Sequence, residues 1–345
     1  MTNPYKSLPS YAFWRRSVTE VEGLDVDPVV DVPFKISKHD RVATAGSCFA
    51  QHISRTLVAD GFEYLVTEAE GENSGVFPAR FGNIYSAKQL RQLFERAYGL
   101  LDPIDAAWVR PDGRWVDPFR PQILTSGFAD QDALAAEREI HLESVRSMFE
   151  RCDVFLFTLG LTEAWVSKQD GAVVPLAPGV VGGGDKRGDY EFRNFDVADI
   201  TADLTTLIDW LRRINSHVRV MLTVSPVPLV ATFEKRHVLV STNYSKSALC
   251  VAAHVVSQSR PAVAYFPSYE IITGPQARGR FYEDDLREIR PEGVAHVMKI
   301  FRRHFLTEKL AGEQLIPSGR SVLARGPTRD LEDVICEEKM LDAGD

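Results

Sequence analysis

The chain contains 345 residues, of which 44% are hydrophobic and 26% are charged, and its formal net charge is −8. This composition is typical of a globular protein with one large α/β domain or two small ones. The acidic balance argues against nucleic acid or an anionic membrane as the main partner.

Short apolar runs alternate with amphipathic helical patterns along the chain. The runs predict strands at residues 41–45, 64–67, 153–159, 218–224 and 262–266. The helical patterns predict helices at residues 49–60, 87–98, 131–151, 199–215, 245–258 and 291–305. This alternation predicts a three-layer α/β/α sandwich with a central parallel sheet. We divide the chain into an N-terminal extension (1–35), one domain (36–306) and a charged tail (307–345).

The spacing of the cysteines and the length of the apolar runs indicate the cellular compartment in which the protein is expected. The four cysteines are scattered without CxxC spacing, so we expect reduced thiols, and neither a metal site nor another cofactor. No apolar run reaches the roughly 18 residues of a membrane span, and the N-terminus lacks the apolar core of a signal peptide. We therefore expect a cytoplasmic protein that does not act at a membrane.

Polar residues follow several predicted strands. They belong to Gly46-Ser47, Phe81-Gly-Asn83, Gly160-Leu-Thr-Glu163, Ser225-Pro226 and Pro267-Ser-Tyr269. Because the carboxyl ends of parallel strands share one edge of a sheet, these groups are expected to form a single site.

Ser47 is the candidate nucleophile at this edge. It stands where a strand turns into a helix, a position at which the helix N-terminus favours developing negative charge. The N–H groups of Ser47 and Gly82 and the side-chain amide of Asn83 are candidate oxyanion donors. Two alternatives stay open, a plain helix N-cap for Ser47 and a turn residue for Asn83. Cys48 is a second possible nucleophile.

Six sequence blocks resemble those of the GSCFA-domain family. They are Gly46-Ser-Cys-Phe-Ala50, Phe81-Gly-Asn-Ile-Tyr-Ser86, Thr158-Leu-Gly-Leu-Thr-Glu-Ala-Trp165, Thr223-Val-Ser-Pro226, Ser245-Lys246 and Tyr265-Phe-Pro-Ser-Tyr-Glu270. The family is similar to SGNH (GDSL-type) hydrolases, which implies a flavodoxin-like fold and a Ser-His-Asp mechanism. By this resemblance Ser47 is the nucleophile, and Gly82 and Asn83 take the oxyanion positions. Thr162-Glu163 replaces the Asn-Asp pair of SGNH enzymes.

The histidine of the triad is missing from its usual place. SGNH enzymes carry Asp-x-x-His before the last helix, but here Asp285 is followed by Glu288, and alignment on the proline gives Arg290. His237, in the loop after the fourth strand, is the best candidate base, and His52 ranks below it. Asp284 and Asp285 are candidates for orienting a histidine.

Two further histidines are weighed against structural roles. His296 lies opposite the apolar stripe of its helix and is expected to be exposed at the surface. His141 shares a helical face with Val145 and Met148 and is expected to be a core or domain-contact histidine.

Two segments allow a role in substrate binding. The Pro/Gly-rich residues 175–185 are either a lid over the site or a plain surface loop. Trp108 and Trp115 either stack on sugar rings or pack in the core.

The sequence therefore predicts an SGNH-like hydrolase or acyltransferase acting on a small-molecule or glycan ester through Ser47. The alternative is a catalytically degenerate binding or assembly protein in polysaccharide metabolism, favoured by the missing Asp-x-x-His.

Overall fold

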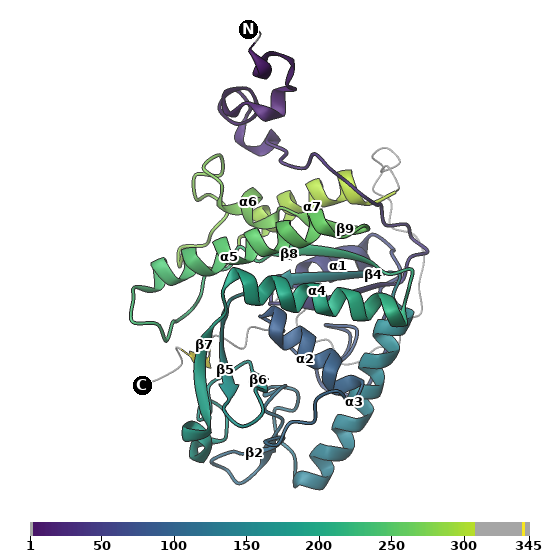
Figure 1. The fold of residues 1–345 in the computed structure, drawn as a ribbon, viewed down its shortest axis with the longest axis vertical. Helices are drawn as coiled ribbons and strands as arrows, with labels where there is room; N and C mark the ends of the chain where they lie inside the picture. Colours follow the sequence, from purple (N-terminus) through teal and green to yellow (C-terminus); the bar gives the residue numbers. More distant parts are fainter. Residues whose placement is uncertain (1–2, 308–339, 342–345) are drawn as a thin grey trace.

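A four-stranded parallel sheet forms the centre of the computed structural model, which describes residues 3–307 and 340–341 (Figure 1). Its strands lie in the order β1-β4-β8-β9 and are all parallel. Their bounds are β1 (Val42–Gly46), β4 (Val154–Leu159), β8 (Arg219–Val224) and β9 (Val263–Phe266). All residues of β1 and β4 are buried, as expected for strands that helices cover on both faces.

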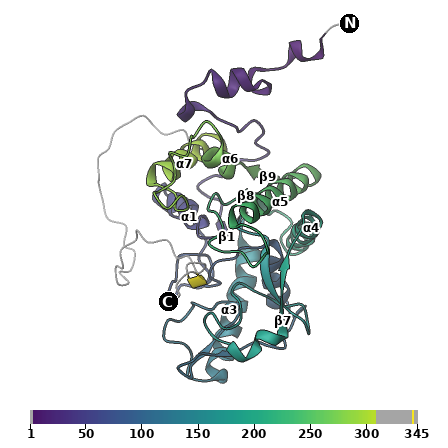
Figure 2. The ribbon, with the colours of Figure 1, turned by 90° about the vertical axis from the view of Figure 1, so that its left-hand side faces the viewer.

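Helices cover both faces of this sheet (Figure 2). One face carries α1 (Ala50–Ala59), α6 (Ser268–Thr273) and α7 (Pro291–Phe305). The other carries α2 (Ala87–Ala97), α3 (Gln131–Arg151), α4 (Val197–Ile214) and α5 (Val238–Ser259). The predicted three-layer α/β/α sandwich is confirmed.

The predicted strand at residues 64–67 is wrong as a strand. Only Tyr64 pairs with the sheet, through a single parallel bridge to Val42. The N–H groups of Thr67 and Glu68 donate to the carbonyl of Pro78 instead, so the chain turns away from β1. The bridge lies on the free edge of β1. If this bridged segment is numbered as a second strand, the order across the sheet is 2-1-3-4-5, as in flavodoxin-like folds.

Two small antiparallel sheets lie beside the sandwich. One pairs β2 (Trp108–Val109) with β3 (Trp115–Val116), and the other has the order β6-β5-β7. The strands of the second are β5 (Glu163–Ser167), β6 (Val173–Val174) and β7 (Tyr190–Asn194). The sequence predicted neither sheet.

The loop at residues 175–185 packs against β2. The N–H of Gly183 donates to the Val109 carbonyl at 3.0 Å, and a Cβ on Gly183 would lie 2.7 Å from the Trp108 ring. Trp108 is 1% exposed, so the core alternative is correct for it and stacking on sugar is wrong.

The N-terminal residues lie outside the sandwich (Figure 1). The short helices η1 (Pro4–Ser7), η2 (Ser10–Ala12), η3 (Arg15–Thr19) and η4 (Gly23–Asp25) contain no buried residue. The predicted charged tail falls almost entirely outside the described residues. Among the described helices, none is long and apolar enough to cross a membrane.

Candidate active site

The end of β1 sets the position of Ser47. Gly46 has φ +142°, which favours glycine, and a Cβ there would lie 2.8 Å from Thr158 Cβ on the neighbouring strand. A larger residue at this position would separate β1 from β4. Glycine therefore allows the chain to turn tightly and to present residue 47 at the sheet edge.

The Ser47 hydroxyl does not cap a helix. Helix α1 begins at Ala50 with Phe49 at the N-cap position, and no side chain caps it. Ser47 is 3% exposed, and its Oγ has no hydrogen-bond partner among the described residues. Such a buried, unsatisfied hydroxyl costs about 1–3 kcal/mol, so it calls for an explanation. The N-cap alternative is wrong.

A small pocket lies next to Ser47, and residues that follow β1, β4 and β8 line it together with Lys246 of α5. Gly160 is so close that a Cβ on it would lie 3.1 Å from Ser47 Cβ. Helix α1 leaves β1 toward one face of the sheet, and α4 follows β4 on the other. Ser47 thus lies at the switch point of the sheet, where ligands of open α/β folds bind.

The strand ends converge only in part. Gly160, Leu161 and Ser225 line the Ser47 pocket, as the sequence predicted for this edge. Ser268, after β9, does not. Its Oγ bonds to the Thr223 hydroxyl at 2.6 Å and to the Val224 carbonyl at 2.8 Å. It therefore ties β9 to β8.

The segment containing Gly82 and Asn83 runs beside Gly46, because the Ile84 N–H donates to the Gly46 carbonyl at 2.9 Å. The side chain of Gln89 fixes this segment by accepting from the Tyr85 N–H and donating to the Asn83 carbonyl. Gly82 has φ +70°, which glycine adopts without strain.

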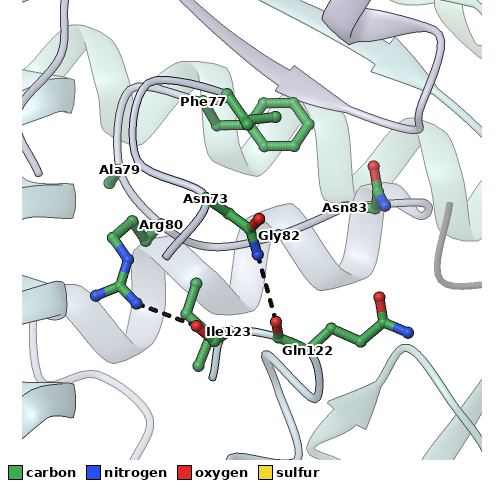
Figure 3. A pocket seen from close by; sticks show the side chains of 9 residues that line it. Asn73, Phe77, Ala79, Arg80, Gly82, Asn83, Gln122 and Ile123 are labelled. Carbon is green, nitrogen blue, oxygen red and sulfur yellow. Dashed lines mark hydrogen bonds between the residues drawn. The ribbon is translucent and has the colours of Figure 1, made fainter. Parts of the chain in front are cut away.

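Gly82 and Asn83 line a neighbouring, mostly apolar pocket. Figure 3 shows it bounded by Phe77, Arg80 and Gln122. Asn83 is buried, and its Oδ1 accepts from the Gln51 amide at 3.5 Å. Asn83 is therefore a fixed interior side chain rather than an exposed turn residue.

The Ser47 N–H is already used within the sheet. It donates to the Thr158 carbonyl at 3.1 Å and so extends the pairing of β1 with β4. In this conformation it is not available to an oxyanion. Three donors to the oxyanion were predicted. The Gly82 N–H and the Asn83 side-chain amide therefore remain as the two proposed donors.

His237 caps a helix instead of contacting Ser47. It is exposed at the N-cap of α5, where its Nδ1 accepts from the Leu239 N–H at 3.1 Å. Lys246, which lines the pocket, lies nine residues further along α5, a rise of about 13 Å. The structure does not place His237 at the pocket, so its role as base stays a prediction.

Asp285 closes an exposed turn. Its Oδ1 accepts from the N–H groups of Arg287 and Glu288, both at 2.9 Å. Arg287 donates to the carbonyl of Pro228, which lines the Ser47 pocket. The turn that takes the place of Asp-x-x-His thus reaches the rim of the pocket but contributes an arginine there.

None of the three remaining candidate histidines is among the described residues that line the Ser47 pocket. The expected exposure of His296 is wrong, because its ring stacks on Phe281 and it is only 8% exposed. His52 packs against Phe49, and burial lowers its pKa to about 4. His141 is buried with its Nδ1 2.7 Å from a Glu68 carboxylate oxygen, which confirms the predicted core role.

We predicted no site role for Lys246, which was named only as part of the Ser245-Lys246 block. It is 1% exposed, and its Nζ donates to the Gly160 carbonyl at 2.6 Å. A signal was present, because Lys246 is spaced at i, i+3 and i+7 with Leu249 and Ala253 on the buried stripe of α5. A lysine on such a stripe is rare enough to mark a site.

A family model of the GSCFA family matches residues 41–301. The chain belongs to the GSCFA family. Among solved structures, an acetyl esterase variant crystallised with acetate is 12% identical, with 76% of this chain and 93% of that chain covered and a TM-score of 0.36. A carbohydrate esterase family 3 protein from Talaromyces cellulolyticus is 10% identical, with 77% and 94% covered and a TM-score of 0.36. Comparison with curated proteins gives no match.

Cys48 of this GSCFA protein also lines the Ser47 pocket and is buried. The cysteine alternative for the nucleophile therefore stays open on geometry. Within residues 3–307 and 340–341, no group of three His, Cys, Asp or Glu side chains is placed to hold a metal ion.

Proposed function

We propose that this GSCFA protein is an acyl-ester hydrolase or acyltransferase with Ser47 as its nucleophile. The observation that carries the proposal is the Ser47 hydroxyl, which is buried at the switch point of the sheet and lacks a partner among the described residues. Buried hydroxyls are normally hydrogen-bonded, and the exceptions gather where chemistry needs them. The six sequence blocks that resemble the family agree with this assignment.

In the proposed reaction, Ser47 Oγ attacks the carbonyl carbon of the ester while a base takes its proton. The Gly82 N–H and the Asn83 amide stabilise the oxyanion, and the positive end of α1 adds to this stabilisation. The bond to the alcohol then breaks, and the alcohol leaves with a proton. Water, or the hydroxyl of an acceptor, attacks acyl-Ser47 and restores the serine.

Replacement of the nucleophile tests this proposal. We expect Ser47→Ala to lower kcat/KM for p-nitrophenyl acetate by about 10³-fold or more, because the acyl-enzyme can no longer form. Ser268→Ala is the matched control, since it also removes a buried hydroxyl at a strand end but lies outside the pocket. Equal rates for wild type and Ser47→Ala would contradict the proposal. Iodoacetamide sensitivity together with an active Ser47→Ala protein would assign the reaction to Cys48.

A binding or assembly role is the second candidate. It is favoured by the occupied Ser47 N–H and by the absence of histidine among the described residues that line the pocket. This candidate predicts no turnover in wild type, so the same assay separates the two.

We propose a glycan as the carrier of the acyl group. Trp165, Phe192 and Phe233 form an aromatic cluster with ring centroids 4.9 to 6.1 Å apart, and Phe233 is 66% exposed. The cluster lies on β5 and β7 and on the loop after β8, close in sequence to pocket residues Gly160 and Leu229. Exposed aromatic faces offer a large, rigid apolar surface against which a sugar ring can pack.

A further inference from the structure

The N-terminal arm, which we define as residues 3–19, buries no side chain against the rest of the chain. Its helices η1, η2 and η3 contain no buried residue, and the arm projects from the sandwich in both views (Figures 1 and 2). Yet Tyr5, Tyr11 and Trp14 are 64%, 58% and 64% exposed. Exposed aromatic side chains gathered on one segment are typical of a surface that binds a partner.

Helix α5 carries a second uncovered apolar surface. Val240, Val251 and Val255 are each at least 45% exposed, and their spacing of 11 and 4 residues places them on one side of the helix. We call these three residues the α5 face. The only lysine, arginine or acid in α5 is Lys246, which is buried, so the exposed side of the helix has no such charge. A helix that is apolar on both sides is normally covered on both.

The arm and the α5 face belong to neighbouring parts of the molecule. Residues 28–33, which connect the arm to the sandwich, line a groove together with His254, Ser257 and Gln258 at the C-terminal end of α5. The arm therefore leaves the sandwich beside one end of the α5 face. A second copy, related by a twofold axis near this groove, can place its arm on that face and receive the first arm in return.

Charge favours a second copy as the partner of the arm. Residues 3–19 contain Lys6, Arg15 and Arg16 and no acid, whereas the whole chain has a net charge of −8, so the remainder carries −11. The acidic body of another copy attracts this basic arm, and the uncharged α5 face does not repel it. The arm and the exposed residues of α5 number about 25 on each copy, within the roughly 20 to 30 that a stable interface uses on each side.

We propose that this protein forms a twofold dimer in which the arm of each copy packs on the α5 face of the other. Tyr5, Tyr11 and Trp14 supply the apolar contact, and the reciprocal exchange closes the assembly at two copies. The proposal does not depend on the proposed catalytic function.

Sedimentation equilibrium of the full chain tests the dimer. We expect wild type to dimerise, and the double variant Tyr11→Ser/Trp14→Ser to raise the dimer Kd about tenfold or more, because aromatic residues dominate such interfaces. Val251→Lys should have a similar effect, since it places a charge of the arm's own sign on the α5 face. Ile140→Lys is the matched control, because Ile140 is also an exposed aliphatic residue of a helix, α3, and should leave the Kd unchanged.

Mixing two variants tests the exchange itself. Tyr11→Ser/Trp14→Ser keeps an intact α5 face, and Val251→Lys keeps an intact arm, so a mixed dimer retains one of the two contacts. The mixture should contain dimer at a concentration at which neither variant alone does. A mixture that behaves as the sum of its components at every concentration would overturn the exchange, because it would indicate pairing of arm with arm or of face with face.

Two further outcomes would overturn the proposal. One is a wild type that stays monomeric at every concentration. The other is a monomer that sediments with vesicles of phosphatidylglycerol in wild type but not in Tyr11→Ser/Trp14→Ser, because the arm would then bind an anionic membrane. Circular dichroism during urea unfolding checks that the variants remain folded, as expected for substitutions of exposed residues.

Discussion

Gly46 shows how one residue makes the geometry of Ser47 possible. Its φ of +142° and its contact with Thr158 leave no room for a side chain. We expect Gly46→Ala to lower the free energy of unfolding by about 2 kcal/mol or more, through backbone strain and the clash together. Urea unfolding followed by circular dichroism measures this loss.

Gly61→Ala isolates the strain from the clash. Gly61 also has positive φ, +75°, but a Cβ there meets nothing within 4 Å. Its substitution should therefore cost only about 1 kcal/mol. Equal losses for the two variants would show that the contact of Gly46 with Thr158 is not what restricts this position.

His52 makes stability depend on pH. Its pKa of about 4 in the folded protein lies below the unperturbed 6.5, chiefly because of burial and also because of Arg55. The unfolded chain therefore binds the proton first, so stability is complete above pH 6.5, falls as pH drops and levels off below about pH 4. Relative to His52→Gln, wild type should lose at most about 3 kcal/mol between pH 7 and pH 4.

Urea unfolding at several pH values measures this difference. A difference between wild type and His52→Gln that does not change with pH would mean that His52 stays protonated or exposed in the folded protein.

At the residue scale, Ser47 and its strand end could be predicted because the Gly-Ser junction between strand and helix is a local pattern. The spacing that places Lys246 on the buried stripe of α5 is visible in the sequence, but no site role was predicted for it, because a charged residue in a predicted helix is normally expected on the solvated face. The use of the Ser47 N–H depends on its bond to the carbonyl of Thr158, 111 residues further along the chain, which no local pattern reveals.

At the scale of elements, the predicted helices at 131–151 and 291–305 match α3 and α7. Helix α5 begins at Val238, seven residues before its predicted start, and His237 caps it. The first turns of α5 have low helix propensity, because Val238, Val240 and Thr242 are β-branched, so the sequence pattern did not predict them as helix. Packing of α5 against α4 and β8 stabilises a helix there instead.

The aromatic cluster on β5, β7 and the loop after β8 gives a prediction at this scale. For a short acetylated oligosaccharide, Phe233→Ala should raise KM about fivefold, since it removes an exposed stacking surface worth about 1 kcal/mol. For p-nitrophenyl acetate, which carries no sugar ring to pack on the cluster, kcat/KM should not change. Both values come from initial-rate measurements.

Ile104→Ala is the control, because Ile104 is also exposed but does not belong to the cluster. An equal change of KM for both esters, or none for either, would remove the role of the cluster in binding a glycan.

At the scale of the whole molecule, the alternation of strands and helices was sufficient to predict the sandwich, because each buried strand is a continuous apolar run. The two small antiparallel sheets were not predictable in the same way. Their strands are as short as two residues, and their cores form only when residues such as Trp108 and Tyr190 meet across long loops.

Among the predicted site residues, those at strand ends could be placed from the sequence, and those on loops and helices could not. The topology brings the residues after β1, β4 and β8 into one pocket, as parallel strands require. It leaves His237, Asp285 and His296 outside that pocket, because loop and helix packing, rather than strand order, sets their positions.

Mass spectrometry after incubation with a fluorophosphonate tests whether Ser47 is an activated nucleophile. We expect one adduct, on the peptide that contains Ser47, and no adduct in Ser47→Ala. An adduct on Cys48 or on another serine, or none in wild type under conditions that label a serine esterase, would contradict it.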